Sequence, residues 1–155
     1  MTLDRRYWDS DCFLGWLLAE PDKEEKCRVV LEAAEQGKLV IVSSALTIAE
    51  VLALRGRPRI GDDRRVLVEA FFRNEYLIIR NLTRRIAEVA RGMVWDHGVA
   101  PKDAVHVATA LDAGLILMNT FDQDLCKHTG RIGSPLLTIE LPQLAEPPLP
   151  FDKKG

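Results

Sequence analysis

The sequence lacks the features that would direct a chain into or across a membrane. Its 155 residues contain no apolar run long enough to span a bilayer, and it does not open with a basic and then apolar signal segment. We therefore expect a cytoplasmic protein with no membrane contact. Cysteine is also scarce, and Cys12, Cys27 and Cys126 do not have the spacing of a metal site. We interpret these three residues as small buried hydrophobic side chains.

Other absences narrow the classes of function. The formal net charge is -2, which argues against a strongly basic nucleic-acid binder. No glycine-rich phosphate loop is present, and Ser43 and Ser44 lack the glycine-flanked turn of a hydrolase nucleophile, so we interpret them as helix caps. Arginine is nevertheless concentrated between Arg55 and Arg65. This stretch is either a solvated surface or a basic rim beside an acidic site, because arginine can bind phosphate or carboxylate through two hydrogen bonds.

The hydrophobic pattern predicts alternating strands and helices. The composition, 47% hydrophobic and 28% charged, suits one globular domain with a substantial core. We predict strands at residues 4–8, 38–44, 76–82, 115–120 and 135–141, and helices at residues 10–19, 22–36, 45–54, 63–74, 83–97 and 101–114. The first strand, "DRRYW", is supported only by its position. The alternation predicts an α/β fold with a mostly parallel sheet. We expect one domain over residues 1–144 and a flexible, proline-rich tail over residues 145–155.

Acidic residues follow the predicted strands at the edge where α/β proteins place their sites. They are Asp9 and Asp11 after the first strand, Glu50 on the helix after the second, Asp103 at the start of helix 101–114, and Asp122 and Asp124 after strand 115–120. Clustered carboxylates repel one another, and a hard divalent cation such as Mg²⁺ relieves that repulsion. The pattern therefore indicates a metal site.

Each acid also has an ordinary explanation at a helix N-terminus. The explanations are N-capping for Asp9, Asp11 and Asp122, a capping box of Thr47 with Glu50, and a favourable interaction of Asp103 with the helix dipole. Capping explains four acids at one sheet edge less well than it explains each of them singly. Asp112 lies about half a turn out of phase with Asp103, so we exclude it. His106, three residues after Asp103, could approach the acids, although we interpret it as a packed, hydrogen-bonded histidine.

Taken together, the motifs resemble those of PIN-domain (PilT N-terminus) nucleases, and within them the VapC-type ribonuclease toxins. The likeness runs from "YWDSDCFL" to "LLTIEL". The matching pieces are Asp9-Ser10-Asp11 after the first strand, Glu50 in "SSALTIAEVLAL", Asp103 in "KDAVHVATALDAG", which is similar to the family's D-A-x-H-x-A-T-A helix, and Thr120, Asp122 and Asp124 in "TFDQDL". The sequence departs from the pattern by Arg5 and Arg6 in the first strand, by Asp11 where a small polar residue is commoner, and by Leu125 in place of an aromatic residue.

The resemblance implies a three-layer α/β/α sandwich with five parallel strands and a metal-dependent endoribonuclease activity. Asp9, Glu50, Asp103 and Asp122 would hold one or two Mg²⁺ or Mn²⁺ ions that activate water against an RNA phosphodiester, with Asp124 as a further ligand and Ser10, Asp11 and Thr120 in support. The implied partners are an RNA substrate, a cognate antitoxin and a second copy of the chain in a homodimer.

Two other functions compete with the nuclease. "DSD" after a strand loosely resembles haloacid-dehalogenase-type phosphatases, in which Asp9 would be the nucleophile and Asp11 the acid/base. That interpretation gives Glu50 and Asp103 no role, and the Gly-Thr that usually follows the motif is missing. A non-catalytic α/β module that binds a partner is the second alternative, and the intact set of acids argues against it.

Overall fold

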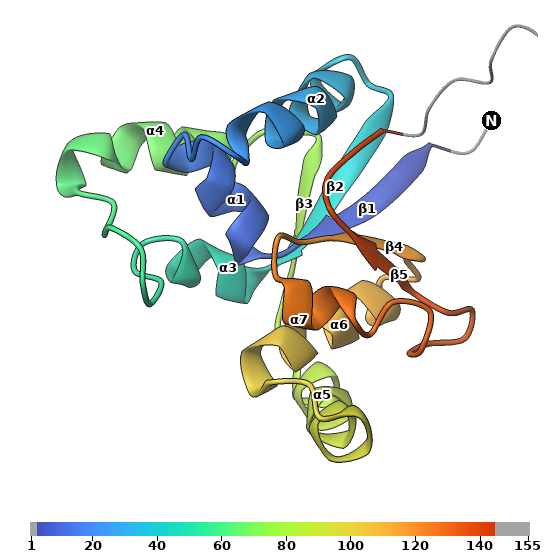
Figure 1. The fold of residues 1–155 in the computed structure, drawn as a ribbon. Coiled ribbons are helices and arrows are strands. Elements are labelled where there is room, and N and C mark those ends of the chain that lie inside the picture. Colours follow the sequence, from blue (N-terminus) through green and yellow to red (C-terminus); the bar gives the residue numbers. More distant parts are fainter. Residues whose placement is uncertain (1–2, 145–155) are drawn as a thin grey trace, which may run out of the picture.

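Five parallel strands form the centre of the protein. The structure, a computed structural model, describes residues 3–144. The strands are β1 (Asp4–Trp8), β2 (Leu39–Ser44), β3 (Leu77–Arg80), β4 (Leu117–Asn119) and β5 (Thr138–Glu140). Their order is β3-β2-β1-β4-β5, and every neighbouring pair is parallel (Figure 1). This arrangement confirms the predicted parallel α/β fold, while the predicted tail at residues 145–155 lies outside the described residues.

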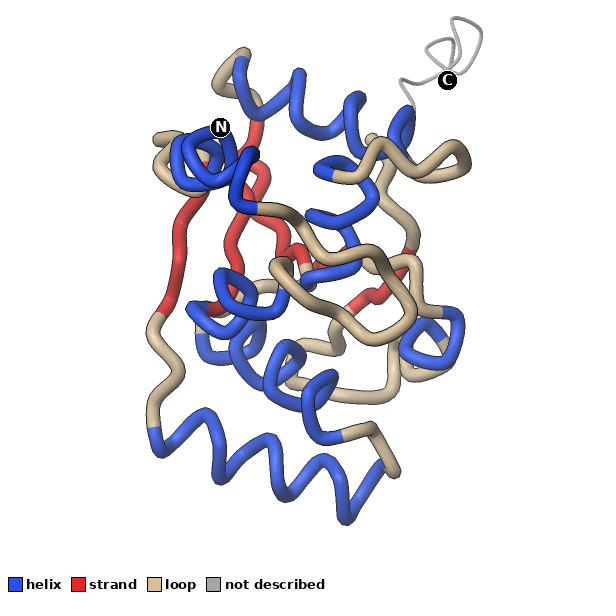
Figure 2. The backbone as a smooth tube through the Cα atoms, turned by 90° about the vertical axis from the view of Figure 1, so that its left-hand side faces the viewer, coloured by secondary structure: helices blue, strands red, loops and turns tan. Residues whose placement is uncertain are grey.

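Helices cover both faces of the sheet. One face carries α1 (Ser10–Leu17), α2 (Glu24–Glu35) and α4 (Arg65–Phe71), and the other carries α5 (Arg84–His97), α6 (Pro101–Asp112) and α7 (Gln123–Cys126). The short α3 (Ala45–Glu50) follows β2, and the 3₁₀ turn η1 (Asp62–Arg64) precedes α4. Figure 2 shows the strands between these helical layers, which confirms the three-layer sandwich. None of the helices within residues 3–144 has the length and apolar character that a membrane span needs.

The two layers have separate hydrophobic cores because successive strand residues point to opposite faces of a sheet. In β1, Tyr7 packs with the α5–α6 side and Trp8 with the α1–α2 side. In β2, Val42 and Ile41 divide in the same way. Both tyrosine and tryptophan at the end of β1 are fully buried, so the strand end that leads into Asp9 is firmly packed on both sides.

Several predicted boundaries are wrong in detail. The helix predicted at 45–54 ends at Glu50, where the chain continues in turns closed by bonds such as Ala53 N–H to the carbonyl of Glu50 at 3.2 Å. The helix predicted at 63–74 is divided into η1 and α4. Cys12 and Cys27 are buried as predicted, whereas Cys126 is partly exposed. The predicted stop of α5 is confirmed at Gly98, whose φ of 67° suits glycine.

The polar first strand is stabilised by contacts of Arg6. This side chain is charged but only 2% exposed, because it lies in the central strand. Its guanidinium donates to the carbonyl of Gln143 at 2.6 Å, to Asp4 Oδ2 at 2.7 Å and to Asn119 Oδ1 at 3.3 Å. Arg6 therefore connects β1 with β4 and with the segment that follows β5, whereas the adjacent Arg5 is exposed.

We expect Arg6→Ala to lower the free energy of unfolding by about 2 kcal/mol, because it empties a buried site and removes the three hydrogen bonds of the guanidinium. Arg5→Ala removes the same side chain from an exposed position and should change stability by no more than about 0.5 kcal/mol. Urea denaturation of both variants and the wild type measures the difference. Equal effects of the two substitutions would contradict a structural role of Arg6.

Candidate active site

Five of the six predicted acids line one cavity at the carboxyl edge of the sheet. The cavity has a volume of about 350 Å³. Its lining consists of Asp9, Ser10, Asp11, Glu50, Leu54, Arg55, Arg57, Asp103, His106 and Asp122. Six of the eight site residues predicted from the sequence are in this set. A seventh, Thr120, does not line the cavity but bonds to Asp9 behind it.

Asp124 is not brought to the cavity. Its side chain is 88% exposed and forms an ion pair with Lys127 at 3.1 Å. Asp112, which the phase of the helix excluded, is also outside the cavity lining and pairs with Arg80 at 2.7 Å. The tertiary structure therefore separates the acids of the sequence into a converging set and a solvent-facing set.

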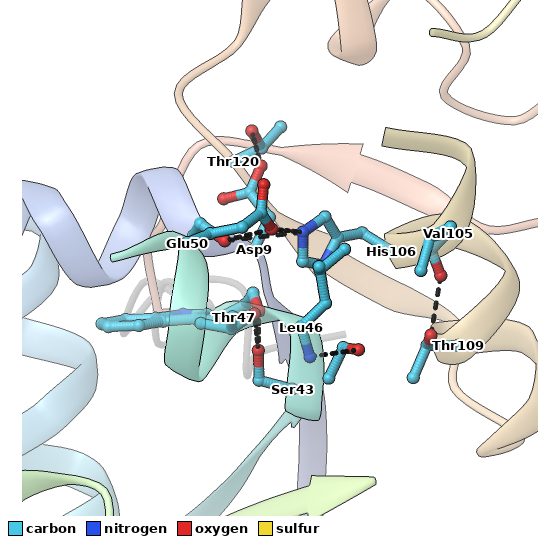
Figure 3. Close-up of polar contacts among 12 residues, drawn as sticks. Asp9, Ser43, Leu46, Thr47, Glu50, Val105, His106, Thr109 and Thr120 are labelled. Atoms are coloured by element: carbon cyan, nitrogen blue, oxygen red, sulfur yellow. Dashed lines mark hydrogen bonds and ion pairs between the residues drawn. The ribbon is translucent and has the colours of Figure 1, made fainter. Parts of the chain in front are cut away.

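Asp9 is buried, and each of its two carboxylate oxygens accepts one hydrogen bond. It caps α1 by accepting a bond from the Cys12 N–H to Oδ1 at 3.2 Å, and the Thr120 hydroxyl donates to Oδ2 at 2.6 Å (Figure 3). Burial raises the pKa of Asp9 to about 6, although the charge of His106 and the bond from Thr120 partly oppose that rise. Capping and a place in the cavity are thus compatible in this residue.

Glu50 does not form the capping box with Thr47 that was its alternative explanation. Ser44 caps α3 by accepting from the Leu46 N–H at 3.1 Å, and Thr47 pairs instead with Ser43 at 2.8 Å. Glu50 Oε1 accepts from the Ser10 hydroxyl at 2.8 Å and contacts His106 Nε2 at 2.8 Å (Figure 3). Burial alone would raise the pKa of Glu50, but His106 and Ser10 outweigh it and lower that pKa below its usual value.

His106 joins the cavity to the core. Because the ionised carboxylate of Glu50 can only accept, Nε2 of His106 is the donor in their contact. The other ring nitrogen, Nδ1, lies 2.6 Å from the hydroxyl of Tyr7. Burial, together with the charge of Asp9, raises the pKa of Tyr7, so its hydroxyl stays protonated. The prediction of a packed, hydrogen-bonded histidine is confirmed, but its role in placing Glu50 was missed, and its position one helical turn after Asp103 was the available signal.

Asp103 and Asp122 differ in how they are held. Asp122 caps α7, and its Oδ1 accepts from the N–H groups of Asp124 at 2.9 Å and Leu125 at 3.3 Å. The side chain of Asp103, in the first turn of α6, forms no hydrogen bond or ion pair within residues 3–144. Burial, together with the nearby charges of Asp122 and Glu50, raises the pKa of Asp103 to about 6. Repulsion between these carboxylates is therefore part of the electrostatics of the cavity.

The donor set fits a hard divalent cation by its chemistry. Carboxylates from four separate segments face one cavity, and Mg²⁺ and Mn²⁺ prefer such oxygen ligands. A cation would also reduce the repulsion between Asp103 and the neighbouring carboxylates. Within residues 3–144, no three His, Cys, Asp or Glu side chains are already drawn together around one point as in a formed metal centre.

The fold and the cavity define a parallel α/β protein with a carboxylate-lined site at the carboxyl edge of its sheet. Residues 7–130 match the PIN domain, so the chain belongs to the PIN domain family, a family of nucleases. A search of curated proteins found no match.

Solved structures with the same fold come from bacteria and an archaeon. Mycobacterium tuberculosis VapC20, described as a Sarcin-Ricin loop cleaving toxin, is 18% identical with a TM-score of 0.63, over 77% of this chain and 92% of that one. A toxin-antitoxin complex from Klebsiella pneumoniae is 18% identical with a TM-score of 0.59, over 90% and 99%. PAE2754 from Pyrobaculum aerophilum is 18% identical with a TM-score of 0.51, over 90% and 84%. At this identity the likeness establishes the fold.

The raised pKa of Asp103 predicts a pH-dependent stability of the metal-free protein. In the folded protein its pKa of about 6 lies above the ordinary value of 3.8, so the fold favours the neutral acid. The stability of the fold therefore falls as the pH rises through 6 and the carboxyl group becomes charged. Relative to Asp103→Asn, the wild type should lose on the order of 1 kcal/mol between pH 4 and pH 7 after allowance for solvent screening. Denaturation in EDTA at several pH values measures this difference.

Asp112→Asn is the matched control on the same helix. Because Asp112 lies outside the cavity, its substitution should leave the pH dependence of the wild type in place. If Asp103→Asn keeps the same pH dependence as Asp112→Asn, the cavity does not strain Asp103.

Proposed function

We propose that this protein is a metal-dependent endoribonuclease and the toxin of a toxin–antitoxin pair. The observation that carries the proposal is the convergence of Asp9, Glu50, Asp103 and Asp122 on one cavity in a PIN-family chain. A phosphatase with Asp9 as nucleophile would leave Glu50 and Asp103 without a role, although both face the same cavity. A purely structural role would not explain the half-buried carboxylate of Asp103, which has no partner within residues 3–144.

Asp9, Glu50, Asp103 and Asp122 would hold one or two Mg²⁺ or Mn²⁺ ions. When bound, the cation would stabilise the charge that develops on the phosphodiester and make water a better nucleophile. The surrounding hydrogen bonds orient the carboxylates, since Thr120 fixes an oxygen of Asp9 while Ser10 and His106 fix an oxygen of Glu50. Asp124 is left out of this ligand set because it is exposed and paired with Lys127.

The proposed substrate and partners follow from the likeness to the solved toxins. VapC20 is described as cleaving the Sarcin-Ricin loop, and the Klebsiella structure is a complex with an antitoxin. We infer RNA as the substrate, a cognate antitoxin as the inhibitor and a homodimer as the assembly. A cavity with five carboxylates would accept a basic side chain of an antitoxin, which would compete with metal for the same charges.

The function is tested with the purified protein on two classes of substrate. We expect cleavage of total cellular RNA with Mg²⁺ or Mn²⁺, none with EDTA, and no hydrolysis of p-nitrophenyl phosphate in any buffer. Co-expression with the product of the neighbouring gene should abolish the cleavage. Hydrolysis of the phosphomonoester without RNA cleavage would contradict the proposal and favour the phosphatase.

A further inference from the structure

Two arginines line the same cavity as the acids. Arg55 and Arg57 stand on either side of Gly56 in the loop that follows α3. The Arg57 N–H bonds to the carbonyl of Leu54 at 3.1 Å, and Gly56 has a φ of 83°, a positive value that favours glycine inside such a turn. The turn therefore brings two guanidinium groups to the border of an acidic cavity.

Arg57 is held in place by an acid of the cavity. Its Nη2 lies 2.5 Å from Asp11 Oδ1 and 3.3 Å from Glu20 Oε1. Lys23 is more distant, with its Nζ 3.8 Å from each of these two carboxylate oxygens. Asp11 lines the cavity and Glu20 does not, so Asp11 is the partner that keeps Arg57 on the cavity side.

This pairing separates Asp11 from the other acids of the cavity. The charge of Asp11 is matched by Arg57, while Asp103 has no partner in the part of the chain that the structure describes. Only Nη2 of Arg57 has a recorded partner within residues 3–144, which leaves Nε and Nη1 as donors. Arg55 is exposed and forms no ion pair there. Guanidinium groups with unused donors bind phosphate well.

We propose that Arg55 and Arg57 bind backbone phosphates of the RNA beside the bond that is cut, and that Asp11 is a positioning residue for Arg57 and not a metal ligand. The inference rests on the proposed ribonuclease function. Its chemical basis is that one cavity contains two kinds of ligand. The acids would bind the cation, and the two arginines would bind the phosphates of the substrate. If Asp11 is neutralised, Glu20 is the remaining close carboxylate, and it draws Arg57 away from the cavity.

This positioning role makes a prediction that simple electrostatics does not. Removing a negative charge near bound RNA should strengthen binding, because the charge repels phosphate. If Asp11 positions Arg57, however, Asp11→Asn weakens binding despite the loss of a repelling charge. Asp22→Asn, an equal change of charge at an exposed residue outside the cavity lining, should leave binding unchanged or slightly stronger.

The experiment measures binding of a fluorescein-labelled single-stranded RNA by anisotropy in EDTA at several salt concentrations. Arg55→Ala and Arg57→Ala should each reduce the slope of log Kd against log salt by about 0.7, which corresponds to on the order of fourfold weaker binding at 0.15 M salt. Asp11→Asn should weaken RNA binding about as much as Arg57→Ala does. The double variant Asp11→Asn/Arg57→Ala should bind RNA no more weakly than Arg57→Ala alone. Asp11→Glu, which keeps the charge, should restore part of the affinity. Arg85→Ala, at an exposed position on α5, is the control for a general loss of charge.

Kinetics and metal binding complete the test. With Mn²⁺, Arg55→Ala and Arg57→Ala should each show a KM about fourfold higher than that of the wild type and a kcat within about twofold of it. Asp11→Asn should bind Mn²⁺ as the wild type does in calorimetry, unlike Asp103→Asn. A loss of Mn²⁺ affinity in Asp11→Asn, or tighter RNA binding by it, would overturn the assignment of Asp11. Unchanged RNA binding by Arg55→Ala and Arg57→Ala would overturn the proposal that these two arginines bind phosphate.

The same measurements separate this inference from the ribonuclease proposal. A wild type that cuts no RNA contradicts the proposed function, and the anisotropy data in EDTA still decide whether Arg55 and Arg57 bind RNA. A wild type that cuts RNA while Arg55→Ala and Arg57→Ala bind and cut as it does contradicts the inference alone.

Discussion

Asp103→Asn is expected to reduce RNA cleavage by on the order of 100-fold or more while the protein stays folded. The substitution keeps the shape of the side chain and removes the charge that would hold a divalent cation. The carboxylate of Asp103 forms no hydrogen bond or ion pair within residues 3–144, so the fold does not depend on it. Its half-buried position and its pKa of about 6 indicate a group whose charge is strained in the absence of metal.

Cleavage of a defined RNA and circular dichroism should be measured on the same preparations. Asp112→Asn serves as the control, since Asp112 lies on the same helix and pairs with Arg80 outside the cavity. It should cleave RNA at close to the wild-type rate. Wild-type-like cleavage by folded Asp103→Asn would remove Asp103 from the active site.

Asp9→Asn is expected to abolish most of the stabilisation that Mn²⁺ confers on the wild type. A ligand that binds only the folded state adds about 2.7 kcal/mol at a hundredfold excess over its Kd. In EDTA the variant should be as stable as the wild type or more stable at neutral pH, because burial opposes the charge of Asp9, as its pKa of about 6 indicates, and asparagine is also a good helix cap. Thermal melts of both proteins, in EDTA and in Mn²⁺, measure the two effects separately.

The structure makes this test demanding, since Asp9 does cap α1 through the Cys12 N–H. If capping were its whole function, the substitution would change the stability by the same amount in both buffers. Asp124→Asn is the comparison, because Asp124 is exposed and bonds to Lys127. It should keep the full Mn²⁺ gain, and a loss there would bring Asp124 back among the ligands.

The local sequence was sufficient to predict the elements that place the site. The α/β alternation follows from side-chain periodicity, and the start of α6 at Pro101 and the end of α5 at Gly98 follow from the restricted backbone of proline and the left-handed conformation of glycine. The convergence of Asp9 and Asp122 was also predictable, because each follows a strand and parallel strands bring their carboxyl ends to one edge. These properties depend on residues close together in the chain or on the topology that their alternation implies.

Contacts between distant segments were decided only by the tertiary structure. The spacing of Thr47 and Glu50 suggested a capping box, but Glu50 instead meets His106 of another helix, 56 residues further on. The burial of Arg6 depends on acceptors in β4 and after β5, which no pattern within "DRRYW" reveals. By itself the sequence determined which acids stand at the edge of the sheet. Which of them share a cavity, which bonds to an arginine and which faces solvent depends on long-range packing, because local periodicity sets the direction of a side chain but not its partner.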